Sequence, residues 1–266
     1  MSATHETGGD CPDLRSAEGD SPVLADTKTG TVPSDNGILR AMSALSGKNR
    51  ITEAFYNGPR FQKFRFWENV FLFYAGGLKG ARRQILRHLP PLENGSLLEV
   101  GIGDGDNVRL LPATTHVTGI DIALNRLFTC HRRYEGRTLP LRLALAEGEH
   151  IPFGDREFDA VVCVGGFNFF SDPGAALAEM ARVTRPGGRV VVADEIPDFL
   201  KYGWGHRIWW PSLDSWLMKR WFGPEFRDMV LTNQIDVPAL AAAPLRDWTI
   251  HRIWRGYGYC LVGEPQ

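Results

Sequence analysis

The sequence has few of the features that mark secreted, metal-binding or membrane-spanning proteins. Its 266 residues include only four cysteines, and no two of them form a CxxC pair. Neither a disulfide framework nor a zinc site is therefore expected. The N-terminus has no basic segment followed by an apolar stretch, and no apolar run approaches the roughly 20 residues of a membrane helix. We therefore expect a cytoplasmic protein without a bound metal.

The composition is that of a globular protein with an atypical N-terminal stretch. Hydrophobic residues make up 43% of the chain and charged residues 23%, which is enough for a sizeable core. Residues 1–36 carry seven acids and two bases and almost no large apolar side chains. Such a segment cannot bury enough surface to offset its ordering entropy. We predict a disordered acidic tail over 1–37 and one folded domain over 38–266.

Short apolar runs alternate with helix-length segments in the folded domain. The runs lie at 96–102, 116–121, 141–147, 158–165 and 188–196. Runs that are apolar on both faces indicate a parallel sheet covered by helices on both sides. One helix is delimited explicitly, because Asp172 can cap it and Pro173 suits its first turn.

The last two strand-like runs, 247–254 and 257–264, are joined by almost no residues. So short a connection requires an antiparallel hairpin. The fold class predicted is therefore α/β, a Rossmann-like doubly wound sheet, mostly parallel, with helices on both faces and a C-terminal antiparallel hairpin. Two segments lie outside this pattern, an N-terminal helical cap over 38–90 and a Trp-rich lid insertion over 198–240.

A glycine-rich turn follows the first strand. Glu99 precedes three glycines at every second position, Gly101, Gly103 and Gly105. Glycines allow a tight turn and let a ligand approach the backbone. The spacing differs from the dehydrogenase fingerprint, because Asp106 stands where the third dehydrogenase glycine would be. This disfavours an NAD-dependent oxidoreductase, and an acid before the glycines suits a cationic ligand.

Asp121 ends the second strand, 20 residues after Gly101. A carboxylate at this point can accept hydrogen bonds from both hydroxyls of a ribose. The alternative is a helix cap for the segment that starts near Ala123.

Four ordered blocks, LLEVGIGDGDN, GIDIALNRL, AEGEHIPFGDREFDAVV and EMARVTRPGGRVVVAD, give the domain a family resemblance. Over roughly 50–263 the sequence resembles the class I S-adenosylmethionine-dependent methyltransferases, in particular the ubiquinone/menaquinone and phospholipid N-methyltransferase group. The resemblance implies S-adenosylmethionine as the cofactor. It also implies that Ile122 lies beside Asp121 in the donor site, and that Glu147 and Gly148 contact the adenine.

Three residues near the ends of later strands are candidates for the catalytic end: Asn168, Asp194 and Glu195. The two acids could hold an acceptor amine or take up its proton. Asn168-Phe169 replaces the Arg-Asn pair of the quinone methyltransferases, which counts against a quinone acceptor. Tyr202 and the tryptophans of the insertion could hold a methylated ammonium group through cation–π contacts.

Bases and aromatics are interleaved over 60–88 and 201–222, and the bases of the first segment are Arg60, Lys63, Arg65, Lys79, Arg82, Arg83 and Arg87. This pattern suits an interfacial helix on an anionic membrane surface. A cap and lid whose aromatics pack over the site would show the same pattern. A near-neutral net charge of −1 and the lack of a recognisable module disfavour nucleic acid as a partner.

We interpret the sequence as a membrane-peripheral methyltransferase of a lipid-like acceptor, with N-methylation of an aminolipid headgroup favoured. The alternative is C-methylation of a prenylated quinone or another apolar small molecule. A protein that binds the donor without turnover is the non-enzymatic alternative.

Overall fold

One mixed sheet organises the part of the chain that the structure, a computed structural model, describes. That part comprises residues 32–33, 37–42, 45, 47–61, 65–66, 73, 77–196, 224–232 and 235–266. The strands are β1 (Val32–Pro33), β2 (Ile38–Arg40), β3 (Ser96–Val100), β4 (His116–Asp121), β5 (Leu141–Leu145), β6 (Phe158–Val164), β7 (Thr184–Glu195), β8 (Leu245–Ile253) and β9 (Gly258–Pro265). Their order across the sheet is β1-β2-β5-β4-β3-β6-β7-β9-β8.

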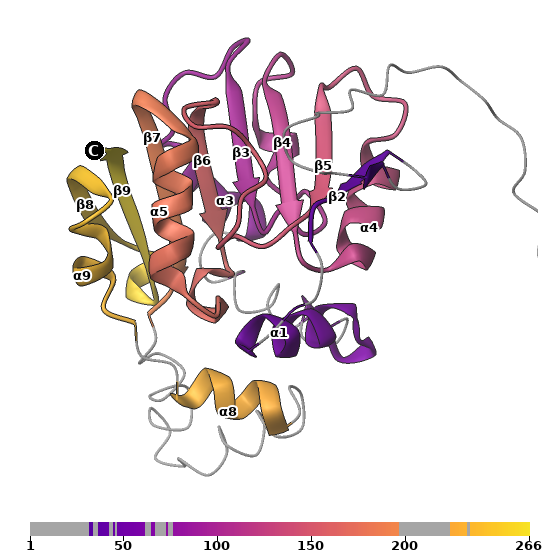
Figure 1. The fold of residues 1–266 in the computed structure, drawn as a ribbon, viewed down its shortest axis with the longest axis vertical. Helices are drawn as coiled ribbons and strands as arrows, with labels where there is room; N and C mark the ends of the chain where they lie inside the picture. Colours follow the sequence, from indigo (N-terminus) through magenta and orange to yellow (C-terminus); the bar gives the residue numbers. More distant parts are fainter. Residues whose placement is uncertain are drawn as a thin grey trace, which may run out of the picture.

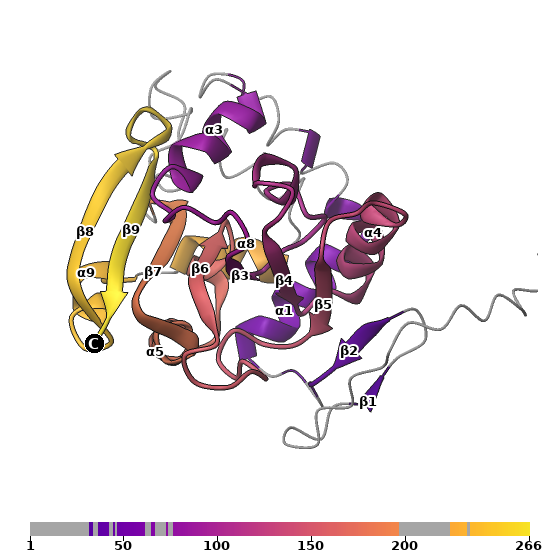
Figure 2. The same ribbon diagram turned by 90° about the horizontal axis from the view of Figure 1, so that it is seen from above.

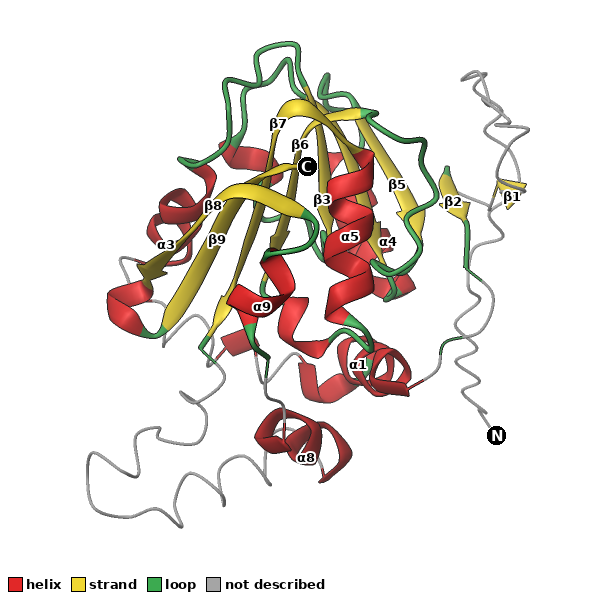
Figure 3. Ribbon diagram, turned by 60° about the vertical axis from the view of Figure 1, so that its left-hand side comes forward, coloured by secondary structure: helices red, strands yellow, loops and turns green. Residues whose placement is uncertain are grey.

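The sheet is parallel at its centre and antiparallel at both edges. All neighbours from β2 to β7 pair in parallel. At one edge β9 runs antiparallel to both β7 and β8, which confirms the predicted hairpin, and at the other edge β1 runs antiparallel to β2 (Figure 3). The predicted fold class is therefore confirmed.

Helices cover both faces of the sheet. They are α1 (Gly47–Asn57), α3 (Gly77–Leu86), α4 (Leu124–Tyr134), α5 (Pro173–Val183), α8 (Pro224–Thr232) and α9 (Val237–Ala241), with short 3-10 turns η1 (Val108–Leu110), η2 (Phe167–Phe169) and η4 (Trp254–Gly256). Helices α3 and α4 lie on one face and α5 and α9 on the other (Figure 2). Helices α1 and α8 lie beyond the carboxyl ends of the parallel strands (Figure 1).

The local sequence explains where α5 begins. The Asp172 side chain accepts a hydrogen bond of 3.0 Å from the backbone N–H of Ala175, and Pro173 occupies the first turn. An N-terminal helix N–H has no partner within the helix, so the carboxylate satisfies one of them. The predicted start of this helix is confirmed.

The N-terminal boundary was predicted wrongly. Residues Ile38–Arg40 were assigned to a helical cap, but they form β2 and pair in parallel with β5. Val32–Pro33, assigned to the disordered tail, form β1. Edge pairing prevailed because Ile38, opposite Leu143, is fully buried. Residues 1–31 and 34–36 of the predicted tail, and residues 198–223 and 233–234 of the predicted lid, lie outside the described residues.

Replacing Ile38 with alanine tests whether β2 is part of the folded core. A fully buried isoleucine reduced to alanine costs about 2–5 kcal/mol of unfolding free energy. Leu39→Ala is the matched control, because Leu39 is only half-buried, and it should cost clearly less. Urea denaturation measures both. Equal, small losses for the two variants would show that β2 does not contribute to the core.

Candidate active site

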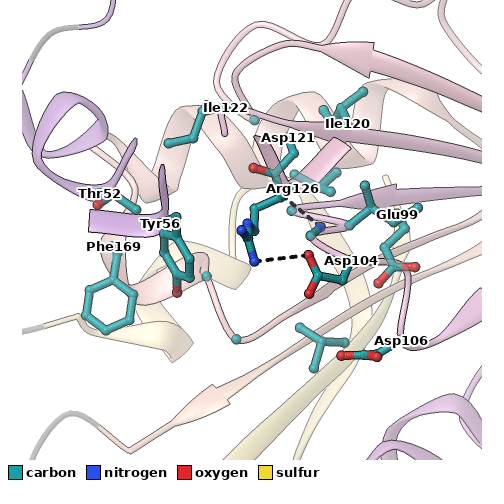
Figure 4. Close-up of a pocket in the computed structure, with 18 of the residues that line it drawn as sticks. Thr52, Tyr56, Glu99, Asp104, Asp106, Ile120, Asp121, Ile122, Arg126 and Phe169 are labelled. Atoms are coloured by element: carbon teal, nitrogen blue, oxygen red, sulfur yellow. Dashed lines mark hydrogen bonds and ion pairs between the residues drawn. The ribbon is translucent and has the colours of Figure 1, made fainter. Parts of the chain in front are cut away.

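A pocket opens at the carboxyl ends of the central parallel strands. Strand β3 pairs with β4 on one side and β6 on the other, so the chain connections diverge there. Ligands of doubly wound sheets bind at such a switch point. Seven predicted site residues line the pocket: Glu99, Gly101, Gly103, Asp121, Ile122, Gly148 and Glu195. Several of these side chains are drawn in Figure 4.

The glycine-rich turn presents bare backbone to the pocket. Gly101 and Gly103 have φ angles of +72° and +55°, in the left-handed region that residues with a side chain rarely adopt. A Cβ added at either position would meet nothing within 4 Å among the described residues. The space in front of the turn can therefore be filled by a ligand that contacts the backbone.

Glu99 is a buried carboxyl group beneath this turn. It is 2% exposed, and its Oε1 accepts a hydrogen bond of 2.7 Å from Asn107 Nδ2. Its Oε2 has no hydrogen-bond partner among the described residues. Burial raises the pKa of Glu99 to about 8, against a smaller lowering by the Arg82 charge. A cationic group in the pocket would stabilise the ionised form and supply the missing partner.

Asp121 connects the glycine-rich turn to the start of α4. Its Oδ2 accepts from the backbone N–H of Gly103 and its Oδ1 from that of Ala123, both at 2.8 Å. The bond to Ala123 is not the helix cap considered from the sequence, because Ala123 is itself the N-cap residue of α4 and no side chain caps it. The same carboxylate lines the pocket, and each oxygen keeps lone-pair capacity for a ligand hydroxyl. The ribose contact therefore stays a prediction.

Two predicted donor residues lie behind the pocket wall instead of in it. A Cβ on Gly105 would come within 2.7 Å of Cys130 Sγ, so this glycine allows close packing against α4. The Glu147 carboxylate lies 3.3 Å from His150 Nδ1, and Glu147 is not a lining residue, whereas Gly148 is. The adenine contact of Glu147 remains a prediction.

The three candidates for the acceptor side also differ in whether they line the pocket. Glu195 lines the pocket, but Asp194 and Asn168 are buried behind it. Burial raises the pKa of Asp194, although its oxygens accept hydrogen bonds from the N–H groups of Asn168 and Glu195 at 2.8 and 2.9 Å. Burial, and next the Asp194 charge, raises the pKa of Glu195 well above its ordinary value. Only Glu195 of the three can touch a ligand in this pocket.

A cluster of ion pairs around the glycine-rich turn was not found from the sequence. Asp104 and Asp106 lie within the turn, and Arg65 pairs with both. From α4, Arg126 pairs with Asp104 at 3.3 Å and Arg133 with Asp106 at 2.8 Å. In Figure 4 the Arg126 side chain reaches across the site toward Asp104. The two extra acids in the turn were the available signal, because acids at a ligand-binding turn need counter-charges.

Aromatic side chains from distant segments close the other side of the pocket. Those that line it are Tyr56, Phe61, Phe169, Phe170, Phe226 and Trp254. Phe55 of α1 stacks on Phe226 of α8 with ring centroids 4.0 Å apart, which joins the cap to the C-terminal part of the insertion. The cap-and-lid interpretation of these aromatics is therefore supported for the described residues.

Two bases assigned to a membrane-facing surface lie at the pocket instead. Arg65 belongs to the ion-pair cluster, and Arg82 acts electrostatically on Glu99 and Glu195; both line the pocket. Arg83 of α3 and Arg87, one residue after the end of that helix, are exposed.

Comparison with known proteins identifies the class of domain. Residues 98–192 match the family model described as a methyltransferase domain. The structure aligns with a SAM-dependent methyltransferase from Aquifex aeolicus over 82% of this chain and 98% of that one, with a TM-score of 0.53 and 15% identity. Residues 98–192 are therefore similar to methyltransferase domains, and the structural likeness shows the fold of a SAM-dependent methyltransferase.

Particular relatives match over parts of the chain. An O-methyltransferase of Penicillium expansum is 31% identical over 50% of this chain and 50% of its own length. A demethylmenaquinone methyltransferase of Thermus thermophilus is 34% identical over 48% of this chain and 60% of its own length. The chain thus spans about half the length of the curated relatives that it matches.

Proton release on donor binding tests the role of Glu99. With a pKa of about 8, Glu99 is mostly protonated at pH 7, and a bound cation favours its ionised form. S-adenosylmethionine binding at pH 7 should release up to about one proton, and donor affinity should rise with pH toward 8. Calorimetry in buffers of different ionisation enthalpy measures this release.

The Glu99→Gln variant is the control for this experiment, because it cannot ionise and should bind the donor without that proton. Equal release from wild type and variant would show that the Glu99 carboxyl does not meet the cationic end of the donor.

Proposed function

We propose that the protein transfers a methyl group from S-adenosylmethionine to an apolar small-molecule acceptor bound beneath α1 and α8. The observation that carries this proposal is one pocket with two chemically different ends. One end has the acid and bare glycine backbone of the turn after β3, and the other has an aromatic wall with Glu195. The methyltransferase domain match supports the reaction class.

The donor end fits the cofactor of the class. Glu99 supplies an unpaired buried carboxylate oxygen for a cationic group, and Gly101 and Gly103 leave open space against the backbone. Asp121 would take the ribose hydroxyls, with Ile122 and Gly148 beside the adenine. When bound, S-adenosylmethionine supplies an electrophilic methyl group on a sulfonium whose positive charge is lost on transfer. The pocket residues therefore act mainly by positioning the reactants.

Glu195 is the residue placed to handle a proton at the acceptor end. An acceptor that exchanges a hydrogen for a methyl group releases one proton as the new bond to the methyl carbon forms. In its ionised form, the Glu195 carboxylate can take that proton, and its raised pKa makes it a stronger base than an ordinary glutamate. The aromatic wall would present apolar faces to the acceptor at this end.

A hydroxylated or quinol-like aromatic ring is the first candidate for the acceptor. The relatives include proteins named O-methyltransferase and demethylmenaquinone methyltransferase, and ring acceptors would pack against the aromatic wall. A quinone-type acceptor was the alternative in the sequence interpretation. Of the pair Asn168-Phe169, which counted against it there, Asn168 is buried outside the pocket and Phe169 lines it.

N-methylation of an aminolipid headgroup, favoured from the sequence, becomes the second candidate. An ammonium group could lie between the Glu195 carboxylate and the aromatic faces of Tyr56 and Trp254, since both rings line the same pocket. The Trp-rich stretch that suggested an amine, including Tyr202, Trp204 and Trp209, lies outside the described residues.

Docking on an anionic membrane is a separate part of the proposal. Lys79 and Arg83 of α3 and Arg87, one residue after its end, are exposed at four-residue spacing, and Phe66 and Phe73 are 62% and 76% exposed. The same helix contributes Ala81 and Arg82 to the pocket, so a bilayer on this stripe would lie near the acceptor end. None of the helices within the described ranges has the length and apolar character to cross a bilayer.

Methyl-transfer assays with labelled S-adenosylmethionine test the proposed reaction. We expect label in a short-chain demethylmenaquinol and none in phosphatidylethanolamine. Glu195→Gln should slow turnover by about a hundredfold or more, as for loss of a general base, without changing donor affinity. The exposed Glu135→Gln is the matched control and should retain turnover.

Label only in phosphatidylethanolamine would replace the first candidate by the second. A protein that binds NADH and ignores S-adenosylmethionine would contradict the proposed function, and donor binding with no transfer to either acceptor would favour the non-enzymatic alternative.

Vesicle co-sedimentation tests the membrane proposal. The wild-type protein should sediment with anionic vesicles and not with neutral ones, and salt should weaken the binding. Each base at the surface contributes about 1 kcal/mol, so the double variant Arg83→Gln, Arg87→Gln should bind roughly thirtyfold more weakly. Arg132→Gln with Arg137→Gln removes two exposed bases, one on α4 and one just after it, and should have no such effect. Equal weakening by both pairs would show only a general effect of net charge.

A further inference from the structure

A buried tyrosine of the C-terminal hairpin reaches the acceptor end of the pocket through one intermediary. Tyr259 of β9 lies opposite Asp194 of β7 in the antiparallel register and is 5% exposed. Its hydroxyl donates a hydrogen bond of 3.0 Å to Asn168 Oδ1. This bond connects the hairpin to η2, the turn after β6. Phe169, which follows Asn168 in that turn, lines the pocket.

Asn168 joins three parts of the structure at once. Its Nδ2 donates to the Glu195 backbone carbonyl at 2.7 Å, and its backbone N–H donates to Asp194 Oδ2 at 2.8 Å. Glu195 N–H donates to Asp194 Oδ1 at 2.9 Å. Both ends of the Asn168 amide are therefore occupied, and the Tyr259 bond determines which end faces Glu195.

We propose that Tyr259 is a positioning residue of this site, which acts through Asn168 to hold the chain at Glu195, and with it the Glu195 side chain, at the acceptor end of the pocket. Asp194 and Glu195 form an acidic pair there, because Asp194 Oδ1 accepts a hydrogen bond from the Glu195 N–H. This inference rests on the proposed function, because it assigns the pair to the acceptor side of a methyltransferase site.

Few other charges bear on this pair. Arg82 of α3 is the basic side chain that acts on Glu195. The Cys163 thiol on β6 and the Tyr259 hydroxyl both have a pKa raised well above the ordinary value, with burial as the first cause, so both stay neutral. Burial, and next the Asp194 charge, therefore distinguishes Glu195 from an ordinary glutamate.

Carbon-13 NMR of the glutamate carboxyl groups, without any donor or acceptor, tests the proposal. The Glu195 signal, assigned by its absence in Glu195→Gln, should titrate at a pH well above the ordinary glutamate value in the wild type. In Tyr259→Phe the Asn168 amide loses the bond that fixes its orientation, its bond to the Glu195 carbonyl weakens, and the Glu195 side chain becomes more accessible to water, so the midpoint should fall toward the ordinary value. Donor affinity, measured by calorimetry, should be unchanged.

Tyr134→Phe is the matched control, because it also removes one buried hydroxyl. Tyr134 donates to the Gly105 carbonyl at 2.7 Å on the donor side of the site. Its loss should weaken S-adenosylmethionine binding by roughly fivefold, the effect of one neutral hydrogen bond, and leave the Glu195 midpoint in place. Tyr259→Phe should therefore change only the Glu195 midpoint, and Tyr134→Phe should change only the affinity for S-adenosylmethionine.

An unchanged Glu195 midpoint in folded Tyr259→Phe would overturn the proposal and make Tyr259 a core residue only. If that variant does not fold, Asn168→Ala must lower the midpoint in the same direction, and an unchanged midpoint there would also overturn it. A wild-type protein that fails to bind S-adenosylmethionine would contradict the proposed function instead, since the titration is read without the donor.

Discussion

The parallel pairing of β3 with β4 on one side and β6 on the other is the constraint on which the site depends. A strand flanked in parallel on both sides must send its connections over opposite faces of the sheet, and a crevice opens where they part. The glycine-rich turn, Asp121 and the acids at the end of β7 all follow strands that end at this crevice. The aromatic cap then only has to cover one edge of the sheet.

The donor half of the site could be predicted from the sequence because its residues are fixed by strand ends. Once a strand and a turn are recognised, the residue at the carboxyl end of the strand must face the crevice, as Glu99 and Asp121 do. The same reasoning gave Glu195 its place at the pocket. It could not separate Glu195 from Asp194, because adjacent strand residues point to opposite sides and the sequence does not reveal which side is open.

The acceptor half could not be predicted in this way because it is assembled from segments far apart in the chain. Phe61, Phe226 and Trp254 come from the cap, the end of the insertion and the hairpin, and their meeting depends on tertiary packing. The inward position of Arg82 could not be predicted either, because its neighbour Arg83 on the same helix is also basic but points outward. The strand at Ile38–Arg40 was missed because three residues are too few to show a period, and its pairing with β5 decided its conformation.

The strand added by the N-terminal segment also affects how the domain can be handled. Without β2, strand β5 would become the edge of the sheet, and its backbone groups would be open to pairing with another chain. Leu143 and Leu145, now buried beside β2, would be uncovered along that edge. A shortened chain that begins at the cap helix would thus offer a template for intermolecular strand addition. Strand β2 therefore covers an edge that would otherwise be open to strand addition, although none of its residues is among those that line the pocket.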